Sequence, residues 1–162
     1  MSVNTVMQKM IDFSDGNLHD ICHFLKVYAY AKTIGEGEGL DPVTQETLEL
    51  AAIVHDIACP LCREKYGSTM GKYQEAEGMP LARELLQGTG TPEDMTERVV
   101  YLVGHHHTLD NVDGIDYRIL LEADFLVNAD ESSYSTEKIQ HAADTVFATA
   151  TGKRLLKSIY KI

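Results

Sequence analysis

Apolar residues recur along most of this chain with the three- to four-residue spacing of amphipathic helices. In the first segment, Val6, Met10 and Phe13 share one face of a short helix, and a run of turn-forming residues ends it. A long second helix is expected from about residue 18 to the glycine-rich stretch at 35–39. Because no segment alternates apolar and polar residues convincingly, the pattern predicts an all-α helical bundle.

Helix-start and helix-stop signals divide the rest of the chain. Asp41 followed by Pro42 is an N-cap acid with proline at the first helical position, so a third helix begins there, and we expect it to break near Pro60. Thr91 and Asp94 resemble a capping box at the start of another helix. The remaining helices are expected at 73–87, 92–107, 117–128 and 136–150, with a short final helix after residue 152.

Length and composition fit one domain. With 162 residues, of which 44% are hydrophobic, the chain can bury one sizeable core. The sequence contains no internal repeat, low-complexity segment or linker. We therefore expect a single domain over residues 1–162, with its core at about 18–128 and C-terminal helices at 136–162.

Charge and cysteine content restrict the partners and the compartment. The formal net charge of −11 repels polyphosphate, which argues against a nucleic-acid polymer or an anionic membrane as the main partner. A small phosphorylated substrate stays compatible, because a bound metal can reverse the local field. Three cysteines do not make a disulfide framework, and the C-x-x-C of Cys59 and Cys62 lacks the context of a redox or zinc motif. We expect a cytoplasmic protein, and a homodimer is compatible with the sequence.

Metal-binding side chains interrupt several of the apolar stripes. His23 shares a face with Val27, and Asp124 lies between apolar residues, as do the adjacent His55 and Asp56. Burying two carboxylates requires a shared positive charge, and imidazole with carboxylate suits zinc, iron, manganese or nickel. The alternative is that each histidine is a hydrogen-bonded core residue and each acid pairs with a lysine or arginine.

The order and context of these residues resemble the H…HD…D pattern of the HD-domain superfamily of metal-dependent phosphohydrolases. His23, the His55–Asp56 pair and Asp124 match the pattern, and the segments around them resemble the corresponding helices of small bacterial HD proteins from about residue 18 to residue 128. The resemblance implies an HD-domain helical bundle with a central metal site. It also implies that these four residues bind one divalent ion, which can be Fe, Mn, Ni, Zn, Co or Mg.

The resemblance implies hydrolysis of a small phosphate ester, with a nucleotide as the expected substrate, by metal-activated water. Asp56 is then also expected to orient the nucleophile. His105 and His106 lie in a run of three histidines where related phosphodiesterases carry a histidine pair, and we expect them to contact phosphate or to support the metal ligands. The alternative is that two of the three histidines face solvent at the C-terminus of a helix. Those relatives carry a further histidine in the interval 74–78, which this chain lacks, so we expect a mononuclear site, with Glu75 or Glu77 as the substitute ligand or general acid/base.

Three further residues are candidates for binding the substrate. Lys26 lies one turn after His23, and Lys72 and Gln74 follow a glycine-containing loop. The alternative for each is a solvated surface position. For the whole protein, two other functions stay open: a diiron oxygenase on the same scaffold, and a regulatory module that binds a metal or a nucleotide without turnover.

Overall fold

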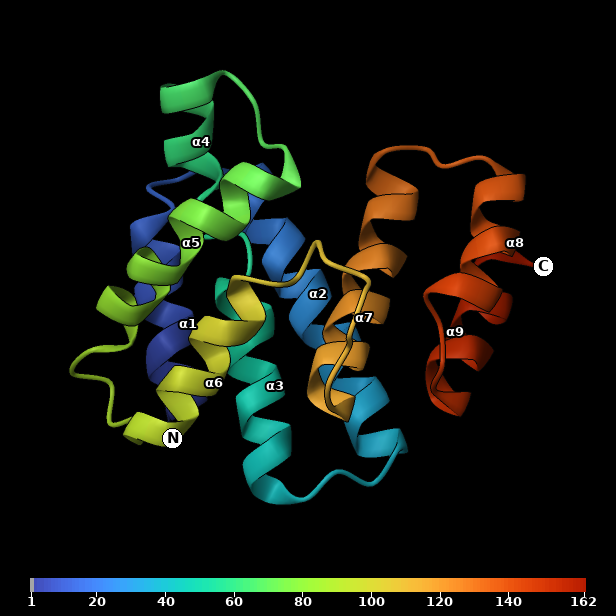
Figure 1. The fold of residues 1–162 in the computed structure, drawn as a ribbon, viewed down its shortest axis with the longest axis horizontal. Helices are drawn as coiled ribbons and strands as arrows, with labels where there is room; N and C mark the ends of the chain where they lie inside the picture. Colours follow the sequence, from blue (N-terminus) through green and yellow to red (C-terminus); the bar gives the residue numbers. More distant parts are fainter. Residues whose placement is uncertain (1) are drawn as a thin grey trace.

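The computed structural model describes residues 2–162, and within this range the chain forms helices and no strand (Figure 1). This confirms the all-α fold class. The helices are α1 (Ser2–Phe13), α2 (Leu18–Gly37), α3 (Pro42–Val54), α4 (Cys59–Tyr66), α5 (Gly71–Leu86), α6 (Glu93–Val103), α7 (Ile115–Glu131), α8 (Thr136–Thr145) and α9 (Ala150–Tyr160).

Helix α2 lies at the centre and packs against α3 on one side and α7 on the other. Helices α5 and α6 form a pair whose α6 member covers α3, while α8 and α9 form a second pair beside α7 (Figure 1). The hydrophobic core includes Phe24 and Ile34 of α2, Leu48 of α3 and Leu120 of α7, all fully or almost fully buried. Within residues 2–162, no helix is both long and apolar enough to cross a bilayer.

Two helix starts follow local rules. The side chain of Asn17 accepts a hydrogen bond from the backbone N–H of Asp20 and caps α2. The side chain of Asp41 accepts one from the N–H of Thr44, and Pro42 occupies the first turn of α3, as predicted.

Several helix boundaries differ from those predicted. Helix α3 ends at Val54, and Pro60 lies in the first turn of α4, where its missing N–H is tolerated, instead of ending a helix. Helix α6 ends at Val103, so the histidine run lies in a turn. The capping box is wrong: Pro92 is the N-cap of α6 and no side chain caps the helix. The helix expected at 136–150 ends at Thr145.

Two acids, the buried Glu122 and the partly exposed Glu38, hold α9 in place. Glu122 of α7 is fully buried, and its carboxylate accepts hydrogen bonds from the backbone N–H groups of Ala148 and Thr149 and from the Thr149 hydroxyl. Thr149 in turn caps α9 by accepting from the N–H of Gly152. At the end of α2, Glu38 accepts from the N–H and hydroxyl of Thr151. The C-terminal helices are thus bonded to α7 and α2.

Candidate metal centre

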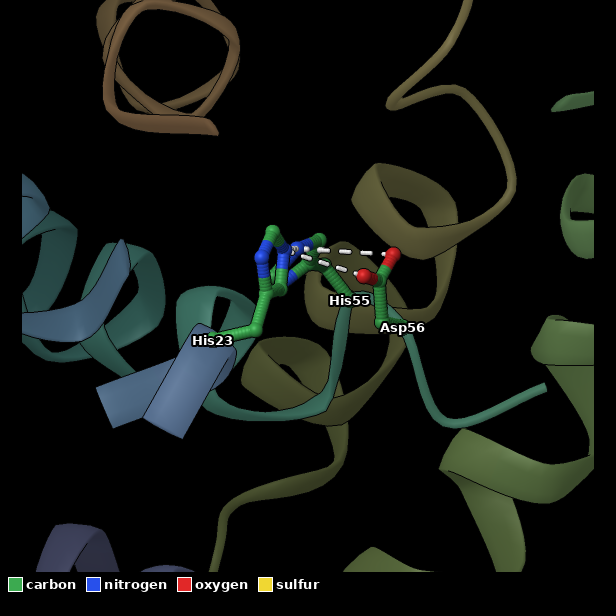
Figure 2. A group of neighbouring side chains, drawn as sticks. All are labelled: His23, His55 and Asp56. Atoms are coloured by element: carbon green, nitrogen blue, oxygen red, sulfur yellow. Dashed lines mark hydrogen bonds and ion pairs between the residues drawn. The ribbon is translucent and has the colours of Figure 1, made fainter. Parts of the chain in front are cut away.

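Four side chains from three parts of the fold converge in the interior. His23 comes from α2, His55 and Asp56 from the turn that ends α3, and Asp124 from α7. Figure 2 shows the imidazoles of His23 and His55 and the carboxylate of Asp56 pointing toward one another. We call His23, His55, Asp56 and Asp124 the candidate metal centre.

Ligand atoms of His23, His55 and Asp56 lie close enough together to hold one cation, and Asp124 Oδ1 borders the two imidazoles. His23 Nε2 lies 3.2 Å from His55 Nε2, 3.0 Å from Asp56 Oδ2 and 3.2 Å from Asp124 Oδ1. His55 Nε2 lies 3.4 Å from Asp56 Oδ1 and 3.3 Å from Asp124 Oδ1. Ligands at about 2.1 Å from an ion are about 3.0 Å apart in an octahedral arrangement and about 3.4 Å apart in a tetrahedral one. The observed separations cover this interval.

Hydrogen bonds on the far side of each ring fix the tautomers. His55 Nδ1 lies 2.7 Å from the carbonyl oxygen of Ala52, which can only accept, so Nδ1 carries the hydrogen. His23 Nδ1 donates in the same way to Glu131 Oε1, at 2.7 Å. In the neutral rings both Nε2 atoms therefore carry a lone pair directed at the carboxylates of Asp56 and Asp124. Lone pairs that face one another in this way are the donor set of a metal site.

The electrostatics of the centre show the same need for a cation. Asp124 Oδ1 is buried and lacks a hydrogen-bond donor among residues 2–162. Burial opposes protonation of His23, but the carboxylates of Asp124 and Asp56 outweigh it and raise the pKa of His23 to about 11. Burial also disfavours the Asp124 carboxylate, yet the neighbouring His55 and His23 hold its pKa well below the usual range. A proton on His23 supplies the positive charge that a divalent ion would otherwise supply to the carboxylates of Asp56 and Asp124.

A second group of donors adjoins the first through Asp56. Asp56 Oδ1 lies 3.4 Å from His106 Nε2, and ligand atoms of Asp56, His106 and His107 lie close enough together to hold an ion. Gln74 Oε1 lies 3.2 Å from His106 Nε2 and 3.1 Å from His107 Nε2. An amide oxygen thus occupies the position between the two rings.

Packing around the turn that follows α6 directs the buried His106 and the exposed His107 toward Gln74. The hydroxyl of Tyr117 donates to the carbonyl oxygens of His105, at 3.0 Å, and Thr108, at 2.5 Å. Gly71 lies so close to His107 that an added Cβ would be 2.7 Å from the Cβ of His107. Burial, followed by the repulsion of His106, lowers the pKa of His107 to about 4, so this ring is neutral at pH 7.

A polar cavity of about 240 Å³ opens on the candidate metal centre. His23, Asp56 and Asp124 line one wall, and Arg63 lines another. Asp20 holds the guanidinium of Arg63 with two hydrogen bonds of 2.7 and 2.8 Å. The cavity therefore places an oriented cation near the centre, in a position suited to an anionic ligand.

The structure places several predicted site residues away from the centre. The carboxylate of Glu77 accepts from Lys65 and from the hydroxyl of Tyr66 at the surface between α4 and α5, which argues against a role as acid or base at the centre. His105 stacks on Tyr101, with ring centroids 3.9 Å apart, and donates to the carbonyl oxygen of Tyr101. Within the histidine run, the buried His106 and the exposed His107 are the rings that contact Gln74.

Of the three residues predicted to bind the substrate, Lys26 and Lys72 contact other side chains, and only Gln74 contacts the histidines near the centre. Lys26 pairs with Glu131 at 2.8 Å, and the exposed Lys72 lies with its Nζ 5.0 Å from the ring centroid of Tyr73. Gln74 is buried and contacts these histidines.

Sequence reasoning missed three residues. Glu131 follows Asp124 by seven positions on the same helix, a spacing of two turns that could have indicated it. His107 was passed over because the helix was expected to continue through the histidine run. For Arg63, the local sequence carries no signal, because its proximity to the centre depends on how α4 packs.

The model of the HD domain family matches residues 20–148 of the chain. The crystal structure of a predicted HD superfamily hydrolase from an uncultured Thermotogales bacterium aligns with a TM-score of 0.70 at 21% identity, covering 98% of this chain and 84% of that one. At this identity the likeness shows a shared fold. No curated protein matches the chain significantly. Because the family match spans most of the sequence and all four residues of the candidate metal centre, this chain belongs to the HD-domain family.

Proposed function

We propose that this chain is a metal-dependent phosphohydrolase that cleaves a small phosphate ester, with a nucleotide as the expected substrate. The observation that carries the proposal is the set of four lone-pair donors in the candidate metal centre, which opens on a cavity lined by Arg63. A phosphate ester is the substrate class that such a centre with a nearby guanidinium suits best.

The chain's own groups account for positioning and proton transfer. A divalent ion in the centre supplies Lewis acidity toward a phosphate oxygen and an attacking water. His106 Nδ1 donates to the carbonyl oxygen of Val103, so a second proton, carried on Nε2, makes the ring an imidazolium that faces the acceptor oxygens of Asp56 and Gln74. That proton is available to the leaving oxygen, which makes His106 the candidate general acid. Asp56 is the candidate for orienting the water.

Arg63 replaces the two lysines as the candidate phosphate anchor. Its guanidinium lines the polar cavity, and Asp20 takes two of its five N–H groups, which leaves three for a phosphate, whereas Lys26 pairs with Glu131 and does not line that cavity. A planar guanidinium can give two parallel hydrogen bonds to a phosphate.

The test is phosphate release by protein loaded separately with Mn²⁺, Co²⁺, Ni²⁺ and Fe²⁺, with nucleoside monophosphates and simple phosphate esters as substrates. We expect turnover in the wild type and in Glu64→Gln, whose side chain is exposed on α4. Asp56→Asn is expected to lose both metal and activity. His106→Gln should retain the metal of the centre while its kcat falls about 100-fold or more. No release from any ester, with stoichiometric metal measured in the protein, would refute the proposal.

The second donor group, formed by Asp56, His106 and His107, favours one other candidate, a dinuclear iron oxygenase. We keep the mononuclear hydrolase as the proposal, because Gln74 offers only a weak amide oxygen where a further imidazole would complete the second group. Anaerobic iron loading followed by EPR separates the two, since a coupled diiron signal would support the oxygenase.

A further inference from the structure

A second cavity, of about 420 Å³, lies between α7, α8 and the segment that follows α6. We call it the α7–α8 cavity. Its volume falls within the range of small-molecule sites. The walls are mainly apolar and partly aromatic, and they include Leu109, Leu121, Phe125, Tyr134 and Val146.

This cavity reaches the candidate metal centre. Asp124 of the centre lines it, together with His106 and His107. Asp124, His107 and Asn128 also line the polar cavity that contains Arg63. A ligand bound at the centre can therefore extend from a polar chamber into an apolar one.

Two basic side chains of α8, Lys138 and His141, stand at the exposed rim of the α7–α8 cavity. Lys138 Nζ lies 3.6 Å from the ring centroid of Tyr134, and it forms no ion pair with a carboxylate of residues 2–162. An ammonium without a carboxylate partner at the mouth of a cavity is notable in a chain of net charge −11. It is positioned to receive an anionic group of a ligand whose flat part lies against Phe125 and Tyr134.

We propose that the α7–α8 cavity selects phosphate esters whose organic part is a flat aromatic group carrying a second negative charge, with Lys138 as the residue that recognises this charge. The inference rests on the proposed phosphohydrolase function and names the substrate class of the same site. The phosphate lies at the centre beside Arg63, the ring lies against Phe125 and Tyr134, whose own ring centroids are 5.4 Å apart, and the distal anion meets Lys138. The C-terminal helices thus determine specificity.

The test uses three esters: 4-carboxyphenyl phosphate, phenyl phosphate and glycerol 3-phosphate. Lys138→Met removes the charge and keeps the apolar stem, and Thr145→Trp narrows the cavity at its exposed rim. Lys153→Met is the matched control, because Lys153 is exposed on α9 and does not line the cavity. Circular dichroism checks that each variant is folded.

We expect the wild type and Lys153→Met to prefer 4-carboxyphenyl phosphate over the other two esters. Lys138→Met should lower kcat/KM for that ester about tenfold and leave the values for phenyl phosphate and glycerol 3-phosphate unchanged. Thr145→Trp should slow both aryl esters and spare glycerol 3-phosphate. Equal rates for all three esters in the wild type, or an equal loss for all three in Lys138→Met, would overturn the assignment while leaving the phosphohydrolase function intact.

A measurement of ligand binding tests the cavity assignment without requiring turnover. Calorimetry of the metal-loaded protein with 4-carboxyphenylphosphonate, which cannot be hydrolysed, should show binding that weakens about tenfold in Lys138→Met and stays unchanged in Lys153→Met. If no ester is turned over, the phosphohydrolase proposal fails, and this titration still decides the cavity assignment. Absence of binding, or binding that Lys138→Met leaves unaltered, would contradict it.

Discussion

Glu131 lies directly behind the candidate metal centre. One of its oxygens accepts from His23 Nδ1 at 2.7 Å, and the other pairs with Lys26 at 2.8 Å. A carboxylate in this position fixes the orientation of the imidazole and raises its basicity as a ligand. At the scale of single residues, the centre therefore consists of the four donors and of the acceptors that hold their rings.

Replacing Glu131 by glutamine is expected to weaken metal binding about 10- to 100-fold, because the neutral amide holds His23 less firmly. Competition with a fluorescent chelator under Mn²⁺ titration measures the change. Glu64→Gln removes one acid from an exposed position of α4 and serves as the control for the altered net charge. Equal affinities in the two variants would show that Glu131 has no positioning role.

At the scale of elements, the docking of α9 depends on close approach. Gly152 in its first turn faces Glu122 of α7, and an added Cβ would overlap the carboxylate oxygen of Glu122. The same carboxylate binds the chain just before the helix, at Ala148 and Thr149. Helix α9 packs against α8, which forms one wall of the α7–α8 cavity, so its docking also supports that wall.

Gly152→Ala is expected to lower the free energy of unfolding by about 1–3 kcal/mol, despite the better helix propensity of alanine, because the methyl group displaces Glu122. Urea denaturation followed by circular dichroism measures the loss. Lys153→Ala, at the next and exposed position, should be nearly neutral. If Gly152→Ala instead raises the free energy of unfolding, α9 accommodates the methyl group by a shift that costs no stability.

Glu38 gives the α2–α9 contact a dependence on pH. Hydrogen bonds from the hydroxyl and the N–H of Thr151 lower the pKa of Glu38 below its ordinary value of 4.5. A lowered pKa in the folded state contributes stability that is fully present above the unfolded pKa and is lost as the pH falls through the folded one. Glu38→Gln should therefore cost about 1 kcal/mol at pH 7 and progressively less below about pH 4.5.

Urea titrations of the wild type and Glu38→Gln at pH 7 and pH 3.5 test this expectation. The difference in unfolding free energy should shrink at the lower pH. A difference that is the same at both values would show that the charge of Glu38 makes no contribution.

At the scale of the whole molecule, the candidate metal centre joins α2, the end of α3 and α7. The buried carboxylate of Asp124 and the partly exposed carboxylate of Asp56 repel each other unless a proton or a cation lies between them. An ion that binds only when these elements are assembled must stabilise the folded state as a unit.

Addition of Mn²⁺ at about 100 times its dissociation constant is expected to stabilise the protein by about 2.7 kcal/mol. For a chain of this size, this corresponds to a rise in Tm of about 5–10 °C, which EDTA should reverse. Asp124→Asn is the control, because it keeps the shape of the side chain and removes one ligand charge. An equal rise in that variant would show that the ion binds elsewhere on the acidic surface.

The sequence by itself determined the helical class, the start of α3 and the stripes that carry His23, His55, Asp56 and Asp124, because periodicity and capping are properties of local sequence. Tertiary structure decided which other residues meet these four. Glu131 and Arg63 reach the site through the packing of α7 and α4, and Glu77 leaves it because Lys65 and Tyr66 bind its carboxylate. The end of α6 at Val103, which turns His106 and His107 toward Gln74, is accompanied by hydrogen bonds from Tyr117, which lies beyond the loop. Such contacts join residues far apart in the chain, and no local pattern encodes them.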